Sequence, residues 1–371
     1  MERTFTATES GTPPPGPTSP GSSAGRCSPS SIGAEGADLQ VPPVTSHQTA
    51  FRPPWWGRNG HIQTIWGPLF RNDRLPLRRE RLSTPDGDFI DLDWLDGDGI
   101  PAVAPRLLVL HGLEGSSRSH YVSGLLRIGR AARWHGIAFN FRSCSGELNR
   151  LPRFYHSGDT SDLHWLVQAL AARAPGVPIG VVGVSLGGNV LLKWLGEVGE
   201  AAPPEILGAV GISVPFDVAA CARVLDRGFR RLVYAANFLK TMRSKVIEKA
   251  RNYPGFVDVA ATRRARTFAR YDRVVTAPLN GFRDEVDYWT QSSSGPYLAR
   301  IRRPTLLLGA YDDPIVPGRT LPDAQSLPPH VRAEFTARGG HAGFLEGHWP
   351  WRAGSWAERR AVEFLTSLLR G

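Results

Sequence analysis

The sequence predicts an α/β fold with a mostly parallel central sheet, helices on both faces of that sheet and a helical cap insertion. Short apolar runs of strand length alternate along the chain with segments of helical periodicity, a pattern typical of parallel sheets. The alternation stops between Pro215 and Ile301, where the chain is rich in arginine and aromatic residues and mostly helical. An insertion between two strands of such a sheet usually folds over the carboxyl ends of the strands. We therefore expect a cap over about residues 216–300.

The first residues differ in composition from the rest of the chain. Residues 1–48 consist largely of Pro, Gly, Ser and Thr, and such a segment cannot bury enough apolar surface to offset the entropy lost on ordering. We predict a disordered tail over 1–48 and one α/β domain over 49–371. The composition changes abruptly at Phe51, and residues 51–66 contain three tryptophans. This tryptophan-rich segment is expected to dock on the folded domain.

Each predicted element has its own signal. Polar and apolar residues alternate over Asp88–Leu95, which predicts a half-buried strand. Asp159 and Asp162 lie in the first turn of a predicted helix, where their charges suit the helix dipole. Continuous apolar runs predict the other strands, and apolar residues three and four positions apart predict helices. The other expected strands cover 106–110, 137–141, 179–184, 206–214, 305–309 and 332–336, and the expected helices cover 121–133, 159–172, 186–198 and 356–369.

Composition excludes several classes of protein. No apolar run approaches the roughly 20 residues that a membrane-spanning helix needs. The first residues lack the apolar segment of a secretory signal. The three cysteines, Cys27, Cys144 and Cys221, are too few and too scattered for a disulfide framework or a metal site. We expect a reduced, cytoplasmic protein without a metal, peripheral to membranes at most.

The formal net charge of +10 raises the question of an anionic partner. The basic residues are mostly arginine and are spread along the chain without a sustained basic block, so we expect no nucleic-acid partner. One local cluster begins at Arg227–Arg231 and continues to Lys249. Two interpretations of it stay open: peripheral contact with lipid head groups, or a solvated helix face. The sequence leaves the oligomeric state open.

The strongest functional signal is the run Gly183-Val184-Ser185-Leu186-Gly187. It follows an apolar run and opens into a helical segment, so it lies at a turn from a strand into a helix. In this setting a G-x-S-x-G turn lifts the serine oxygen out of the backbone as a nucleophile. The two glycines leave room for the strained turn, which a side chain would obstruct. Ser185 is therefore the predicted nucleophile.

A serine nucleophile needs a base and a carboxylate that orients the base, and in this fold class they follow the serine in the order acid, histidine. His341 follows the last predicted strand and is the predicted base. The acid comes from Asp312 or Asp313, which follow the strand before it. Counting from the strand end favours Asp312, whereas counting back from Pro317 favours Asp313, which we prefer. The spare carboxylate should lie in solvent, at a helix start or against an arginine.

Two backbone N–H groups should stabilise the negative charge that develops on the substrate oxygen. Leu186, directly after the nucleophile, supplies one of them. The loop His111–Gly115 follows an earlier strand, and Leu113 is its expected donor. His111 is expected to brace this loop rather than to transfer protons. The predicted chemistry needs no cofactor.

These residues together resemble the YheT-like branch of the α/β-hydrolases, the group that includes the mammalian hydrolase-domain lipases. The resemblance runs from about Phe51 to the C-terminus and implies the α/β-hydrolase fold. In the family pattern the second aspartate of the pair is fixed, which supports Asp313. The long Pro-rich tail departs from this pattern. The resemblance rests on Gly60–Thr64 after a tryptophan pair, His111–Ser116, Asn140–Glu147, Tyr155–Asp159, Gly183–Asn189, the cap pattern from Asp272 to Tyr288, Asp312–Pro314 and Gly339–Phe344.

The resemblance implies a serine hydrolase of carboxylic esters, with acylglycerols, phospholipids and small acyl esters as the substrate range. The individual substrate does not transfer with the fold. Two alternatives stay open. The same machinery can serve a thioesterase or an amidase. A non-catalytic member of this fold could instead bind lipid or a protein partner through the tryptophan-rich segment and the basic cap.

Overall fold

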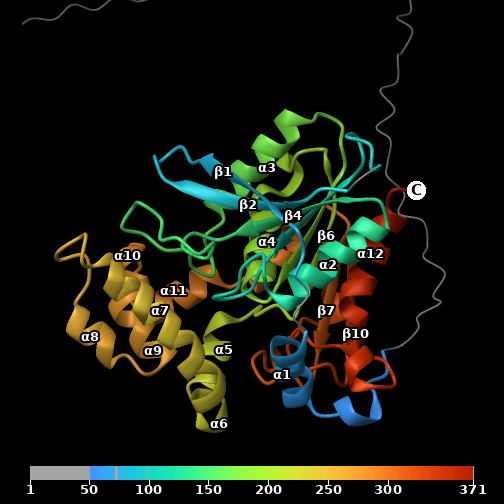
Figure 1. Ribbon diagram of the computed structural model, residues 1–371. Helices are drawn as coiled ribbons and strands as arrows, with labels where there is room; N and C mark the ends of the chain where they lie inside the picture. Colours follow the sequence, from blue (N-terminus) through green and yellow to red (C-terminus); the bar gives the residue numbers. More distant parts are fainter. Residues whose placement is uncertain (1–50, 72–73, 98, 371) are drawn as a thin grey trace, which may run out of the picture. The chain divides into compact units, whose positions relative to one another are not determined.

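The computed structural model describes residues 51–71, 74–97 and 99–370, and the predicted tail lies outside them. Its centre is an eight-stranded sheet in the order β1-β2-β4-β3-β5-β6-β7-β8 (Figure 1). β2 runs antiparallel to both of its neighbours, and the strands from β4 to β8 are parallel. This confirms the predicted, mostly parallel sheet. The strands are β1 (Arg78–Ser83), β2 (Phe89–Leu95), β3 (Arg106–Leu110), β4 (His135–Asn140), β5 (Ile179–Val184), β6 (Ile206–Ile212), β7 (Thr305–Ala310) and β8 (Val331–Thr336), with a separate pair β9 (Leu345–Glu346) and β10 (Gly354–Ser355).

Helices cover both faces of the sheet, as the sequence predicts. α2 (His120–Ala131) and α12 (Trp356–Ser367) bury their apolar residues against one face, together with Val109, Val182 and Leu308 of the strands. α3 (Ser161–Arg173) and α4 (Leu186–Val198) cover the other face (Figure 1). Within the described part of the chain, no helix is both long and apolar enough to cross a membrane.

The prediction of a half-buried strand over Asp88–Leu95 is wrong, because β2 is buried along nearly its whole length. Its aspartates face a strand that the sequence analysis did not predict, the arginine-rich β1. In the register of this pair Arg81 lies opposite Asp91, and the two side chains form an ion pair at 2.8 Å. Arg79 pairs with Asp93 in the same way. These guanidinium groups compensate the buried carboxylates, so polar residues in β2 do not mark a solvent-exposed face.

The helix predicted from Asp159 begins two positions later, at Ser161. Only Asp162 lies in its first turn. Asp159 precedes the helix and forms an ion pair with Arg153, with the donor and acceptor atoms 2.7 Å apart. This ion pair holds Asp159 in the preceding loop.

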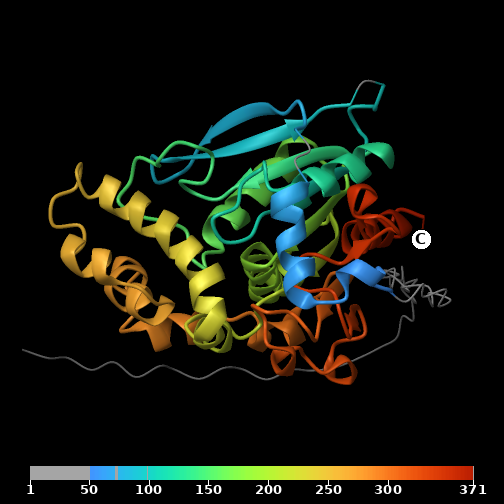
Figure 2. The ribbon, with the colours of Figure 1, turned by 60° about the horizontal axis from the view of Figure 1, so that its bottom comes forward.

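The chain between β6 and β7 forms a helical layer of its own. Its helices are α5 (Val218–Leu225), α6 (Gly228–Arg230), α7 (Ala236–Lys249), α8 (Val259–Arg264), α9 (Phe268–Tyr271), α10 (Ala277–Leu279) and α11 (Glu285–Ser292). Residues of α5, α7, α9, α10 and α11 share an apolar cluster that also includes Ile315 and Val316, from the loop after β7. Most of these helices gather at one side of the sheet, where they appear in gold and orange in Figure 2. This layer therefore packs over the carboxyl ends of the parallel strands.

The tryptophan-rich segment forms α1 (Gly60–Phe70), which begins after the capping residue Asn59. The Asn59 side chain accepts the N–H groups of His61 and Ile62, which satisfies two donors that a helix start leaves unpaired. Trp56 and Trp66 pack against each other, with ring centroids 4.9 Å apart. In Figure 2 this helix, in blue, lies close to the orange and red loops that follow the last strands of the sheet.

Candidate active site

Ser185 lies on a strained turn between β5 and α4. Its backbone has φ 53° and ψ −121°, which a residue with a side chain rarely adopts. The N–H of Ser185 donates to the carbonyl of Ile212 at 2.8 Å, which ties the turn to the neighbouring strand. A Cβ atom on Gly183 would lie 2.5 Å from the carbonyl oxygen of Gly187, and a Cβ atom on Gly187 would lie 2.5 Å from that of His111. Both positions therefore require glycine.

The structure brings Ser185, His341 and Asp313 together from three separate loops. His341 Nε2 lies 2.9 Å from Ser185 Oγ, and His341 Nδ1 lies 2.8 Å from Asp313 Oδ2. The other carboxylate oxygen of Asp313 accepts the N–H groups of Ile315 and Val316 at 2.7 and 2.9 Å. The Asp313 side chain is only 1% exposed. Its carboxylate is thus fixed by three hydrogen bonds, one of which orients the imidazole.

Among the described residues, Asp312, the alternative acid, makes no hydrogen bond to the imidazole. Its carboxylate accepts the N–H of Gly340 at 2.9 Å, and burial raises its pKa above the usual range. A Cβ atom on Gly60, the first residue of α1, would lie 3.1 Å from this carboxylate. Asp312, the spare aspartate, is therefore held beside a helix start, one of the three surroundings expected for it.

Helix α1 holds the loop that carries His341. The Thr64 hydroxyl oxygen accepts the backbone N–H of His341 at 2.9 Å, and Gln63 Oε1 accepts the N–H of Leu345 at 2.6 Å. Gly340 has φ 60°, and a Cβ atom there would lie 2.6 Å from the Cβ atom of Gln63. The expected docking of the tryptophan-rich segment thus occurs at the candidate site. The sequence alone predicts no role for Thr64 and Gln63, since nothing in their spacing pairs them with residues near the C-terminus.

Leu113 and Leu186, the two expected oxyanion donors, both line the same cavity as Ser185. Within the described part of the chain, neither backbone N–H has a hydrogen-bond partner. A Cβ atom on Gly112 would lie 3.1 Å from the Cβ atom of Ser185, so the loop of Leu113 passes close to the serine. The Gly112 N–H donates to the Tyr121 hydroxyl at 2.9 Å, which fixes the loop from the side of α2.

His111 is fully buried behind this loop. Its Nδ1 lies 2.7 Å from the Gly112 carbonyl, and the Phe141 N–H donates to Nε2 at 3.2 Å. Desolvation by burial lowers the pKa of His111 to about 4. A neutral ring that donates through Nδ1 and accepts through Nε2 satisfies both contacts. This geometry supports the expected bracing role.

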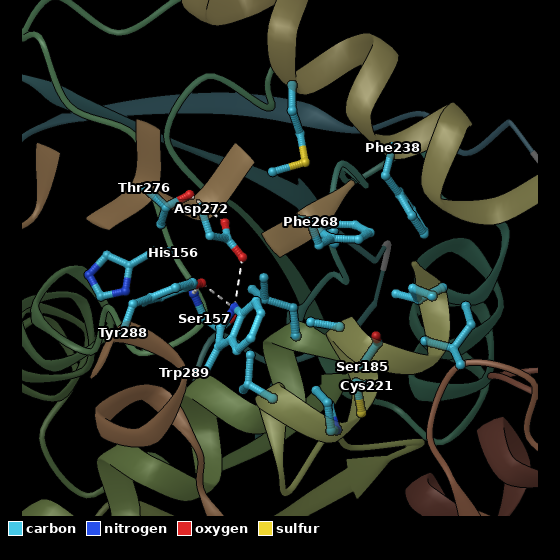
Figure 3. A pocket seen from close by; sticks show the side chains of 18 of the residues that line it. His156, Ser157, Ser185, Cys221, Phe238, Phe268, Asp272, Thr276, Tyr288 and Trp289 are labelled. Carbon is cyan, nitrogen blue, oxygen red and sulfur yellow. Dashed lines mark hydrogen bonds between the residues drawn. The ribbon is translucent and has the colours of Figure 1, made fainter. Parts of the chain in front are cut away.

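A cavity with about 750 Å³ of empty space, part of it open to solvent, extends from Ser185 under the helical layer. Figure 3 shows Ser185 and Cys221 together on one side of this cavity and Asp272, Thr276 and Tyr288 on the other. Much of the wall is apolar, and it includes Val218, Leu225, Phe238, Phe268, Trp289 and Ile315. An apolar wall beside a nucleophile can hold the hydrocarbon part of a substrate.

Asp272 is a buried carboxyl group at the far side of this cavity. Its two oxygens accept from the Thr276 hydroxyl at 2.6 Å and from Trp289 Nε1 at 2.8 Å (Figure 3). Desolvation by burial raises the pKa of Asp272 to about 7. The sequence analysis assigned it no role, although its place in the cap pattern singled it out.

The fold and the arrangement around Ser185 are those of an α/β hydrolase. Residues 105–348 match the family model described as alpha/beta hydrolase fold, and the chain belongs to this family. The YheT protein of Escherichia coli (strain K12) is 38% identical over 327 residues, which are 87% of this chain and 95% of YheT. Membership of the group that the sequence resembles is thereby confirmed.

More distant relatives carry names that describe an activity. The human protein named phospholipase ABHD3 is 29% identical, over 86% of this chain and 79% of its own. A monoacylglycerol lipase of Saccharomyces cerevisiae is 30% identical, over 65% of this chain and 55% of its own. Among solved structures, DcsB in complex with its substrate analogue has a TM-score of 0.52 and 15% identity, and the match covers 80% of this chain and 100% of that one. This last similarity shows the fold alone.

Proposed function

We propose that this protein is a serine hydrolase that cleaves carboxylic esters through an acyl-enzyme. The hydrogen-bonded series from Ser185 through His341 to Asp313, at the mouth of an apolar cavity, carries this proposal. The relatives support the reaction class, since a phospholipase and a monoacylglycerol lipase both hydrolyse esters. The cytoplasmic location stays a prediction.

In the proposed reaction, Ser185 Oγ attacks the carbonyl carbon of the ester while its proton passes to His341 Nε2. The carbonyl oxygen becomes negative and accepts hydrogen bonds from the N–H groups of Leu113 and Leu186. His341 then protonates the leaving alcohol, which departs and leaves the acyl group on Ser185. A water molecule repeats the sequence and releases the carboxylic acid. Asp313 keeps the imidazole oriented and stabilises its charged form.

The cavity favours substrates with an acyl chain. Its wall includes Leu186, Val218, Cys221 and Ile315, which offer no charge to a ligand. We propose acylglycerols, phospholipids or short and medium acyl esters as the substrate class. Apolar burial supplies about 0.8 kcal/mol for each methylene group, so longer chains gain affinity until the cavity is filled.

A fluorophosphonate probe tests the mechanism, since it phosphorylates an activated serine. We expect stoichiometric labelling of the wild type and loss of labelling in Ser185→Ala, together with loss of hydrolysis across a panel of p-nitrophenyl esters. Cys221→Ser is a matched control, because this thiol lines the same cavity and has no part in the proposed chemistry. Labelling that persists in Ser185→Ala would refute the assignment.

We also propose peripheral contact with lipid surfaces through the beginning of the cap. Phe229 and Leu232 are 58% and 69% exposed, and three exposed arginines flank them at 227, 230 and 231. The Phe229 ring contacts His61 at the start of α1, with ring centroids 5.4 Å apart, so this apolar and basic surface adjoins the helix that holds the His341 loop. Exposed apolar side chains with basic neighbours suit an anionic membrane surface.

Sedimentation with vesicles tests this contact. We expect binding to vesicles that contain phosphatidylserine and much weaker binding to pure phosphatidylcholine. The double variant Phe229→Ser, Leu232→Ser should lose binding and keep its activity on a soluble ester. Equal sedimentation of the wild type and the double variant would leave the cluster as a solvated helix face.

A further inference from the structure

A second, smaller cavity adjoins the main one beside the loop His111–Gly115, here called the oxyanion loop, and has about 400 Å³ of empty space. Four residues line both cavities: Leu113, Tyr155, Met242 and Thr276. The side chains of Glu114, Lys245 and Asn280 line only the smaller one. The two cavities therefore share a wall that includes Leu113; the larger cavity is mainly apolar, and the smaller has a charged pair in its lining.

Glu114 has one carboxylate oxygen in use and one unused. Its Oε1 accepts from Lys245 Nζ at 3.0 Å and from the Tyr155 hydroxyl at 3.1 Å. Its Oε2 is buried and has no hydrogen-bond partner among the described residues, and the side chain is only 7% exposed. A buried acceptor without a partner is costly, so a donor is expected from outside the protein chain.

The backbone of Glu114 holds this carboxylate in place. Its φ of 55° lies in the left-handed region, which costs free energy for a residue with a side chain. The Glu114 N–H donates to the Tyr155 hydroxyl at 2.7 Å, so one tyrosine contacts both the backbone and the carboxylate. The side chain is therefore fixed directly after the proposed oxyanion donor, Leu113.

The charged groups of this cavity indicate which kind of ligand group could donate a hydrogen bond to Glu114. A ligand cation would face the Lys245 ammonium, and a ligand phosphate would face the Glu114 carboxylate, so a neutral group fits the pair best. A hydroxyl is neutral and can both donate and accept a hydrogen bond. Lys245 has three N–H donors, and its contacts to Glu114 and Cys144 use two of them. A hydroxyl can therefore donate to Glu114 and accept from Lys245.

We propose that Glu114 and Lys245 bind a free hydroxyl group on the leaving alcohol of the ester, as in a diol or glycerol monoester. The proposal rests on the proposed function. An ester has two branches at its carbonyl carbon, and both cavities are lined by Leu113, the residue whose N–H would hold the carbonyl oxygen. The larger, apolar cavity suits the acyl chain, which leaves the smaller one for the alcohol.

Two esters of equal size test this subsite: hydroxyethyl octanoate and propyl octanoate, which differ in a hydroxyl against a methyl group. We expect the wild type to prefer the hydroxyethyl ester in kcat/KM, and Glu114→Gln to reduce this preference about ten-fold, because a hydrogen bond to a charged group is lost. Methoxyethyl octanoate, which cannot donate, should behave like the propyl ester. Tyr155→Phe is the matched control: it loosens the loop but keeps the Glu114 carboxylate, so it should slow both esters equally.

The outcomes separate the subsite from the proposed function. If Glu114→Gln lowers kcat/KM for both esters by the same factor, Glu114 only positions the loop and the proposal of a hydroxyl subsite is wrong. The subsite is also wrong if the wild type hydrolyses both esters at equal rates. If the wild type hydrolyses neither ester and resists the fluorophosphonate probe, the proposed function itself fails. Labelling of Ser185 by the probe in Glu114→Gln excludes misfolding as the cause of an altered preference.

Discussion

The Thr64 hydroxyl oxygen lies 2.9 Å from the backbone nitrogen of His341, so a residue of the first helix holds the loop of a residue near the C-terminus. Thr64 is itself fixed, because its hydroxyl donates to the Gly60 carbonyl at 2.6 Å. A hydroxyl that donates to one backbone and accepts from another links two segments with one group. The first helix is thus part of the support of the candidate site.

Thr64→Val should lower kcat without a matching change in KM. The methyl group that replaces the hydroxyl leaves the His341 N–H unpaired and lets the imidazole shift, and a shift of about 1 Å can cost on the order of a hundred-fold in rate. Steady-state kinetics on a soluble ester measure the effect. Thr64→Ser keeps the hydroxyl and should retain most of the activity. Equal losses in both variants would contradict the role of this hydrogen bond.

The two adjacent aspartates should differ sharply in their effects. Asp313→Asn should lower kcat by about a thousand-fold or more, because an amide no longer orients and stabilises the charged imidazole. Asp312→Asn should lower it by less than about ten-fold, since the Asp312 carboxylate accepts backbone N–H groups of the neighbouring loop. Single-turnover kinetics with a p-nitrophenyl ester compare the variants. A larger loss in Asp312→Asn would reassign the acid.

Gly187→Ala should destabilise the fold and abolish labelling by the fluorophosphonate probe. The added Cβ atom would lie 2.5 Å from the carbonyl oxygens of Leu110 and His111, and backbone atoms cannot move aside as a side chain can. Urea unfolding should show a loss of several kcal/mol. Gly354→Ala is the control, since its Cβ atom would meet only Glu346 side-chain atoms at 3.7 Å. A stable, labelled Gly187→Ala protein would contradict the close approach.

Asp272 should make stability depend on pH. Burial raises its pKa from the ordinary value of 3.8 to about 7, so between these values the folded protein binds the proton more tightly than the unfolded chain. The contribution of this proton to stability is fully present below about pH 4 and is lost as the pH rises through about 7. The free energy of unfolding of the wild type, measured relative to Asp272→Asn, should therefore fall over this range by a few kcal/mol.

Urea unfolding at several pH values measures this difference. Asp287→Asn is the control within the same helical layer, because a hydrogen bond from the Arg283 side chain lowers the pKa of Asp287 to about 2. Asp287 titrates below the pH 4–7 window. The difference in unfolding free energy between the wild type and Asp287→Asn should therefore not change over this window. If the difference in unfolding free energy between the wild type and Asp272→Asn does not change with pH, Asp272 is charged in the folded protein over this range.

The sequence was most informative where local rules decide the structure. The run from 179 to 198 combined an apolar strand, two glycines and a helical period, and β5 and α4 have the predicted bounds. β2 was misjudged because alternation describes only one strand, whereas burial of Asp91 depends on Arg81 of the neighbouring strand. Local pattern carries no information about such a partner.

The sequence by itself determined the α/β architecture, the strand-turn-helix around Ser185 and the order of serine, acid and histidine, because periodicity, glycine and chain order act over short distances. Only the tertiary structure decided that the Asp313 carboxylate contacts His341 and that Thr64 holds the histidine loop. It also decided that Glu114 keeps a buried oxygen without a partner beside the oxyanion loop. These features depend on atoms far apart in the chain, whose positions follow from packing and not from local sequence.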